Sequence, residues 1–178
     1  TGENSIAYAQ YIVHQKEAFM KPIHIVAAVA LLLSVSIGVA VAADPAPNFS
    51  LKTSDGKTIE LKKLQGKVVI VNFWATWCPP CRREIPGMTK VYTKYKSKGL
   101  EIVGIALDNG GWDDVNPWLQ KNPINYPIVL GNQELTELYG GVRSIPTTFV
   151  VDRKGNIVDK HVGALLEEDF EKVVKGAL

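Results

Sequence analysis

The sequence has few of the residues that build metal clusters and disulfide-rich scaffolds. Its 178 residues include only two cysteines, Cys78 and Cys81. They exclude a disulfide-dense scaffold and any four-thiolate zinc or iron–sulfur site within one chain. Lys and Arg (20) nearly balance Asp and Glu (18), and a net charge of +2 is too small to indicate a nucleic-acid partner. The sequence contains no G-x-G-x-x-G motif, so we expect no nicotinamide or flavin, and we expect no other cofactor or metal.

Only one long apolar run is present, and it lies near the N-terminus. Residues 22–43 contain no Asp, Glu, Lys or Arg, and Lys21 comes just before them. A basic start, an apolar stretch and small residues ending in Ala42 and Ala43 are typical of a cleaved signal peptide. The alternative is a retained membrane anchor, because residues 25–43 are 19 mostly apolar or small residues and approach the roughly 20 that span a bilayer. Both alternatives predict export of the remainder to the periplasm, either soluble or anchored to the inner membrane and facing outward.

These features divide the chain into three parts. We interpret residues 1–19 as an upstream or added extension, because Met20 is the first methionine. Residues 20–43 are the signal peptide or anchor. Residues 44–178 are long enough for one domain with its own core.

Within residues 44–178, strand patterns alternate with helix patterns. Residues 44–47 are expected to be an extended linker and 48–61 a hairpin. A strand that begins at Val68 is expected to run through to Trp77 and to lead into a helix from Pro79. One side of this helix carries lysines, which we interpret as a solvated face.

The rest of the chain continues this alternation. Asp113 and Asp114 are predicted to cap a short helix, with Pro117 among its first N–H positions. Asn132 is predicted to cap another helix, and Glu167 begins the first turn of the last one. Further strands are expected at 100–107, 126–130, 147–151 and 157–162. The order predicts an α/β fold with a central mixed sheet flanked by helices, an N-terminal hairpin and a central helix–strand insertion.

The two cysteines lie where this strand meets this helix, in the sequence Trp77-Cys78-Pro79-Pro80-Cys81. A cysteine at a helix N-terminus lies at the positive end of the dipole, which favours its thiolate. Proline is well accommodated in the first helical position, and two prolines make the link between the sulfurs stiff. We therefore expect Cys78 to attack a substrate disulfide and Cys81 to resolve the mixed disulfide.

Two other interpretations of the cysteine pair remain open. In the first interpretation the pair is a purely structural disulfide. So short a loop removes little entropy from the unfolded chain, however, and would stabilise the fold only slightly. The pair forms a metal site with His161 or Met88 in the second, although only two thiolates are present and they lie on one helical turn.

Residues 71–86, with their Cys-x-x-Cys motif, resemble the active-site segment of the thioredoxin superfamily. More narrowly, the chain is similar to the exported TlpA/ResA-like thiol–disulfide oxidoreductases. The resemblance covers nearly all of 44–178 and also rests on Glu84, on the helix–strand unit between 113 and 130, and on residues 145–149. It implies a thioredoxin-like fold and a disulfide reductase.

The resemblance also implies roles for individual residues. Pro146 is expected to be a cis-proline packed against the dithiol, and the backbone of Ile145 to bind substrate. We expect Trp77, next to Cys78, to form an apolar contact surface for a partner, and we count Pro79 and Pro80 with it as substrate contacts.

Asn72 marks a departure from ordinary cytosolic thioredoxins, which carry a buried aspartate on this strand. An amide cannot shuttle a proton. Glu84 follows Cys81 by three residues and can therefore share its face of the helix. We predict that Glu84 is partly buried, has a raised pKa and relays the proton of Cys81. The alternative is a surface glutamate paired with a lysine.

The function predicted from the sequence is reduction of disulfides in specific envelope proteins. The resemblance implies clients of the cytochrome c maturation or copper-site assembly type, and electrons from a membrane thiol donor. Two alternatives are a copper-binding chaperone module and a peroxiredoxin-type peroxidase. The peroxidase would need a threonine and a proline before a single attacking cysteine, and residues 77–81 depart from that pattern.

Overall fold

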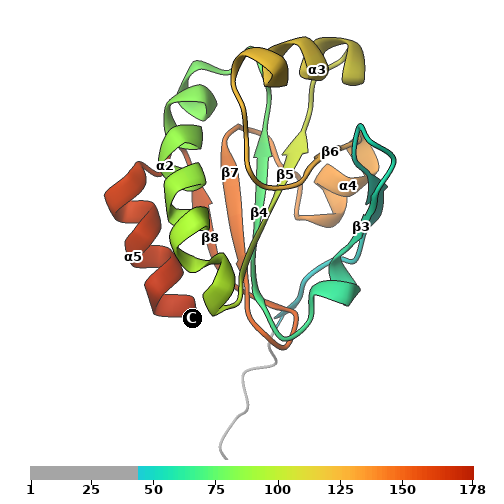
Figure 1. Cartoon of the computed structure of the whole chain (residues 1–178). Helices are drawn as coiled ribbons and strands as arrows, with labels where there is room; N and C mark the ends of the chain where they lie inside the picture. Colours follow the sequence, from blue (N-terminus) through green and yellow to red (C-terminus); the bar gives the residue numbers. More distant parts are fainter. Residues whose placement is uncertain (1–43) are drawn as a thin grey trace, which may run out of the picture. The chain divides into compact units, whose positions relative to one another are not determined.

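Two β-branched runs form the central strands of a six-stranded sheet. The computed structural model describes residues 44–178, and within them β4 (Val68–Trp74) and β5 (Leu100–Ala106) are parallel and buried at every position (Figure 1). The predictions for residues 1–19 and 20–43 lie outside the described part. No helix within 44–178 is both long and apolar enough to cross a membrane.

The remaining strands complete a mixed sheet, which confirms the predicted fold class. The strand order is β1-β8-β7-β4-β5-β6, in which β6 is parallel to β5 and the other three are antiparallel to their neighbours. The bounds of these four strands are β1 (Asp44–Pro45), β6 (Ile128–Leu130), β7 (Thr147–Val151) and β8 (Asn156–Val162).

Helices cover both faces of the sheet. Helices α2 (Pro79–Tyr95) and α5 (Glu167–Ala177) pack on the face that carries Val68, Ile70 and Trp74. The opposite face of β4 packs against α4 (Gln133–Leu138) and against the predicted hairpin, which is formed by β2 (Ser50–Lys52) and β3 (Thr58–Glu60). Figure 1 shows α3 (Trp112–Lys121) crossing the carboxyl end of β4 and β5. Two 3-10 turns, at Leu61–Leu64 and Lys96–Lys98, complete the elements.

Several predicted boundaries were wrong. The supposed linker begins as an edge strand, because Asp44 and Pro45 pair with β8; a proline is tolerated at a sheet edge. Strand β4 ends at Trp74 rather than at Trp77, and the chain turns before Cys78.

The start of α3 also differs from the prediction. The residue before its first turn is Gly111, at φ 58°, and no side chain caps it. Asp113 and Asp114 instead lie inside the first turn, where the dipole still favours them. Pro117 is consequently the sixth helical residue and lies beyond the first four N–H positions.

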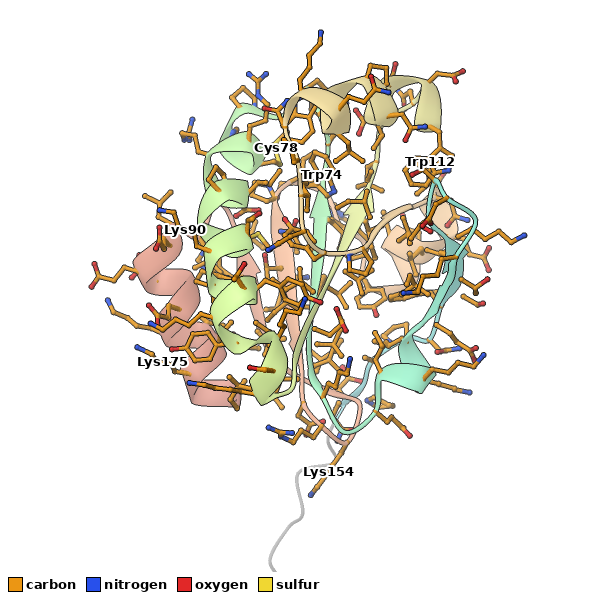
Figure 2. All side chains as sticks on the ribbon, in the orientation of Figure 1. Trp74, Cys78, Lys90, Trp112, Lys154 and Lys175 are labelled. Carbon is orange, nitrogen blue, oxygen red and sulfur yellow. A yellow bond between two sulfur atoms is a disulfide. The ribbon has the colours of Figure 1, made fainter. Side chains whose placement is uncertain are left out.

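The lysine side of α2 is not simply solvated, because it faces the acidic side of α5. Lys90 contacts Glu167 at 2.8 Å, and Lys94 contacts Glu171 at 2.6 Å. Figure 2 labels Lys90 on α2 and Lys175 on the neighbouring α5. The lysines therefore help to align the two helices, although each exposed pair contributes little stability.

The strand directions bring distant segments to one end of the sheet. Because β7 is antiparallel to β4, its first residue, Thr147, pairs with Phe73 near the end of β4. Val162, at the end of β8, pairs with Thr147 in turn. The segment before β7 therefore lies against Cys78, and the segment after β8 lies against Glu84 on α2.

Candidate active site

Cys78 and Cys81 form a disulfide across the first turn of α2. Cys78 is the N-cap residue of the helix, and its extended backbone (φ −89°, ψ 107°) lets Sγ accept the N–H of Cys81 at 3.3 Å. Pro79 and Pro80 occupy the first two helical positions, where no N–H is needed. Cys78 is 3% exposed and Cys81 is fully buried, so an approaching partner meets Cys78 first.

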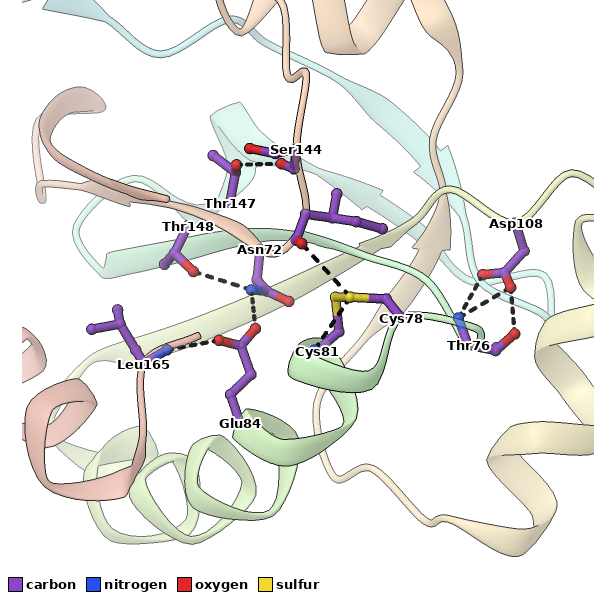
Figure 3. The surroundings of a disulfide bond; sticks show 11 residues. Asn72, Thr76, Cys78, Cys81, Glu84, Asp108, Ser144, Thr147, Thr148 and Leu165 are labelled. Carbon is purple, nitrogen blue, oxygen red and sulfur yellow. Dashed lines mark hydrogen bonds between the residues drawn. A yellow bond between two sulfur atoms is a disulfide. The ribbon is translucent and has the colours of Figure 1, made fainter. Parts of the chain in front are cut away.

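The segment before β7 faces the disulfide. The Ile145–Pro146 peptide bond is cis, as the family resemblance implies. Sγ of Cys78 lies 3.7 Å from the carbonyl oxygen of Ile145 (Figure 3). Pro146 is buried and Ile145 is partly exposed, so the backbone of Ile145 borders the sulfur that a partner would reach.

The surface around Cys78 is apolar. Trp77 is 62% exposed, the largest exposed fraction among the large hydrophobic side chains of residues 44–178. Pro79 is exposed and Pro80 partly so. These three side chains, predicted to contact substrate, border the sulfur that is reached first.

Glu84 lies one helical turn beyond Cys81 and is 1% exposed, more deeply buried than predicted. Its carboxylate accepts the amide N–H of Asn72 at 2.9 Å and the backbone N–H of Leu165 at 3.0 Å (Figure 3). No lysine pairs with it in the described residues, so the surface ion-pair alternative was wrong. Burial raises the pKa of Glu84 to about 7, against the opposing effect of the two hydrogen bonds.

Asn72 connects the acid to the sheet. Its amide nitrogen also donates to the hydroxyl of Thr148 at 3.1 Å, because Asn72 and Thr148 are register partners in β4 and β7. The Asn72 amide oxygen is buried and has no hydrogen-bond partner within residues 44–178. If the amide turns over, this oxygen can accept a hydrogen bond from the O–H of a neutral Glu84 carboxyl group.

Comparison with known proteins identifies the family of the chain. A family model described as the AhpC/TSA family matches residues 42–160. The chain belongs to the AhpC/TSA family.

Its relatives within this family include thiol–disulfide oxidoreductases. "Thiol-disulfide oxidoreductase ResA" of Bacillus anthracis is 41% identical over 132 residues, which cover 73% of this chain and 75% of that protein. The protein of the same name from Bacillus subtilis (strain 168) is 37% identical over 134 residues, covering 73% and 74%. The crystal structure of a thiol:disulfide interchange protein of the thioredoxin family from Chlorobium tepidum TLS has a TM-score of 0.71 and 42% identity, over 77% of this chain and 97% of that one. The chain is therefore a ResA-like, thioredoxin-fold member of the family.

One residue that supports the turn before Cys78 was not predicted from the sequence. Asp108 follows β5 and is 8% exposed. Its carboxylate accepts the backbone N–H of Thr76 at 3.1 Å and the hydroxyl of Thr76 at 2.5 Å. These bonds hold the turn that leads into Cys78. An acidic residue just after a buried parallel strand was the available signal, since such strands end at the same edge as β4.

The metal alternative for the cysteines has no support in the described residues. Nowhere in 44–178 do three His, Cys, Asp or Glu side chains gather in a group able to hold an ion. The sulfur of Met88 instead lies 4.0 Å from the hydroxyl of Tyr126 in the core.

Proposed function

We propose that the domain reduces disulfides of specific partner proteins in the cell envelope. The observation that carries this proposal is the position of Cys78, which caps α2 and is the more exposed cysteine of the pair. The helix N-terminus favours the Cys78 thiolate once the disulfide is reduced.

The reaction has two exchange steps. The Cys78 thiolate attacks a client disulfide, forming a mixed disulfide and releasing one client sulfur as a thiolate. Cys81 then loses its proton and attacks Sγ of Cys78, which releases the second client thiolate and leaves Cys78 bonded to Cys81. The client gains two electrons, and the protein is left oxidised.

Glu84 supplies the base for the second step. It lies one turn from Cys81, and its pKa of about 7 allows the carboxylate to take up a proton near neutral pH. Asn72 and Leu165 orient the carboxylate through their hydrogen bonds. Ile145 presents its backbone to the client, Pro146 packs against the dithiol, and Trp77, Pro79 and Pro80 form the apolar contact.

Each turnover requires two electrons from outside the domain. We propose a membrane thiol donor, delivery to the periplasm by residues 20–43, and clients of the cytochrome c maturation or copper-site assembly type. The similarity to thiol–disulfide oxidoreductases supports protein thiol clients, and the apolar segment at residues 22–43 supports export.

The test uses the two cysteine variants in the cell envelope. Cys78→Ser is expected to abolish disulfide reduction, because the attacking sulfur is lost. Cys81→Ser is expected to accumulate a mixed disulfide, visible as a dithiothreitol-sensitive adduct on a non-reducing gel, whose partner mass spectrometry identifies. Adducts that form through Cys81 in Cys78→Ser, and not in Cys81→Ser, would reverse the assigned order of attack.

A further inference from the structure

A groove runs beside the dithiol along one side of α2. Its volume is about 320 Å³, and it lies between the first half of α2 and the end of α3 with the loop that follows. The lining residues from α2 have the spacing of one helical face, and three residues come from the α3 side: Arg82, Ile85, Pro86, Thr89, Trp118, Asn122 and Pro123. The backbone N–H of Arg82 donates to the carbonyl oxygen of Cys78 at 3.1 Å, so the groove begins one helical turn beyond Cys78.

The groove has an apolar floor and unsatisfied polar groups. Trp118 packs on Trp74, with ring centroids 5.2 Å apart, and Ile85 is buried beside it. The hydroxyl of Thr89 is buried without a hydrogen-bond partner in residues 44–178. Pro86 has no N–H, so the carbonyl oxygen of Arg82 lacks its usual helical donor. An extended peptide supplies apolar side chains for this floor and a backbone N–H for the carbonyl oxygen of Arg82.

The charge at the head of the groove is uncompensated. Arg82 and Arg83 are exposed, and every ion pair within residues 44–178 uses a lysine. No carboxylate is among the groove-lining residues. A guanidinium binds a carboxylate through two parallel hydrogen bonds, which gives geometric selectivity as well as attraction.

We propose that this groove binds the client chain next to its reacting cysteine, as an extended segment that carries a carboxylate for Arg82 and apolar side chains for Trp118 and Ile85. The inference rests on the proposed function. From Arg82 to Thr89 the helix rises by about 10 Å, which accommodates about three extended residues. Clients are therefore selected by acidic and apolar residues within a few positions of the disulfide.

The test compares matched disulfide peptides as substrates of the reduced protein. The peptides carry Glu, Gln or Lys at the first, second or third residue on either side of the attacked cysteine. At low salt we expect kcat/KM for Glu to exceed that for Gln by roughly three- to ten-fold at one or more of these positions, with Lys the poorest. The preference should shrink at about 0.5 M salt, because exposed charges are screened.

Three variants identify the arginine responsible. Arg82→Gln should bring the Glu-to-Gln ratio close to one, and Arg82→Lys should retain part of the preference. Arg83→Gln is the matched control, since Arg83 carries the same charge and is also exposed but does not line the groove, and it should retain the full ratio. Equal rates for all peptides, or a preference that survives Arg82→Gln, would overturn the proposal.

A binding measurement locates the peptide independently of turnover. A peptide with Ser in place of its cysteines should shift the Trp118 indole and Asn122 amide NMR signals of the oxidised protein. Shifts confined to β8, or groove shifts that depend on protein concentration without peptide and so reveal a second copy, would contradict the proposal. If the wild type reduces no peptide and no small disulfide such as 2-hydroxyethyl disulfide, the proposed function itself fails.

Discussion

Glu84 and Glu101 are both buried carboxylates, but they lie at opposite ends of the central strand pair. Glu101 is the second residue of β5 and pairs with Val69 near the start of β4, whereas Glu84 lies beside the disulfide at the other end. Glu101 is 9% exposed and Glu84 is 1% exposed. Their environments differ in the kind of hydrogen-bond donor that each receives.

Glu101 is a compensated charge. The ammonium of Lys67 lies 2.8 Å from one of its oxygens, and the hydroxyl of Tyr92 donates to the other at 2.6 Å. Glu84 receives only neutral donors, from Asn72 and from the Leu165 backbone. The pKa of a buried carboxylate rises when no cation compensates its loss of hydration. Glu84 is such a carboxylate, and it lies at the end of the sheet that carries the cysteines. Glu84 is therefore the acid that we expect to exchange a proton near neutral pH.

The largest expected effect comes from removing the uncompensated acid. Glu84→Gln should slow exchange by roughly 10- to 100-fold, because Cys81 loses its base. The wild-type rate should show an inflection near pH 7, which the variant lacks. Stopped-flow tryptophan fluorescence during reduction of a protein disulfide, from pH 5 to 9, measures both quantities.

Glu101→Gln is the matched control for this experiment, because it neutralises a buried carboxylate away from the dithiol. Its pH profile should keep the wild-type inflection. If the inflection persists in Glu84→Gln and disappears in Glu101→Gln, the titrating group is at the Glu101 end of the sheet, and the role assigned to Glu84 is wrong.

The same raised pKa has a consequence for stability. Below about pH 4.5 the carboxyl group is protonated in both the folded and the unfolded chain and contributes nothing. Between about pH 4.5 and 7 the unfolded chain releases this proton and the folded domain retains it, so stability falls as the pH rises. The cost approaches about 3 kcal/mol above pH 7.

Glu84→Gln removes this dependence. We expect the free energy of unfolding of the variant, relative to the wild type, to rise by about 3 kcal/mol between pH 4.5 and 8 in the disulfide form. Urea denaturation at several pH values measures the difference. A difference that is independent of pH would mean that Glu84 titrates normally in the folded domain.

The burial of Glu84 beside the dithiol was within reach of the sequence, because the signals for it are local. The three-residue spacing places Glu84 on the Cys81 side of α2, and an amide in the apolar run of β4 needs a partner. The hydrogen bond between Asn72 and Glu84 was not itself predicted. The fold class followed from the alternation of strand and helix patterns in the same local way.

The remaining contacts around the site depend on strand register and on which distant segments the topology brings together. The sequence alone specifies neither. Thr148 meets Asn72 because β7 is antiparallel to β4, and Leu165 reaches Glu84 only after β8 has crossed back. Asp108 reaches Thr76 from the neighbouring strand. The end of β4 was misplaced because Thr76 and Trp77, two strand-favouring residues, follow Trp74, although the chain must turn there to place Cys78 at the helix start.

The smallest expected effect is at the compensated acid. Glu101→Gln keeps an oxygen for the Tyr92 hydroxyl and loses only the ion pair with Lys67, whose side chain is 45% exposed. We expect a loss of about 0.5–1 kcal/mol in the free energy of unfolding at pH 7, because solvent screens a half-exposed partner. Urea denaturation measures this loss, and added salt should reduce the difference from the wild type. The rate of disulfide exchange should stay within two-fold of the wild-type rate. A larger loss of rate would show that the two ends of the sheet are coupled, and the distinction drawn between Glu101 and Glu84 would not hold.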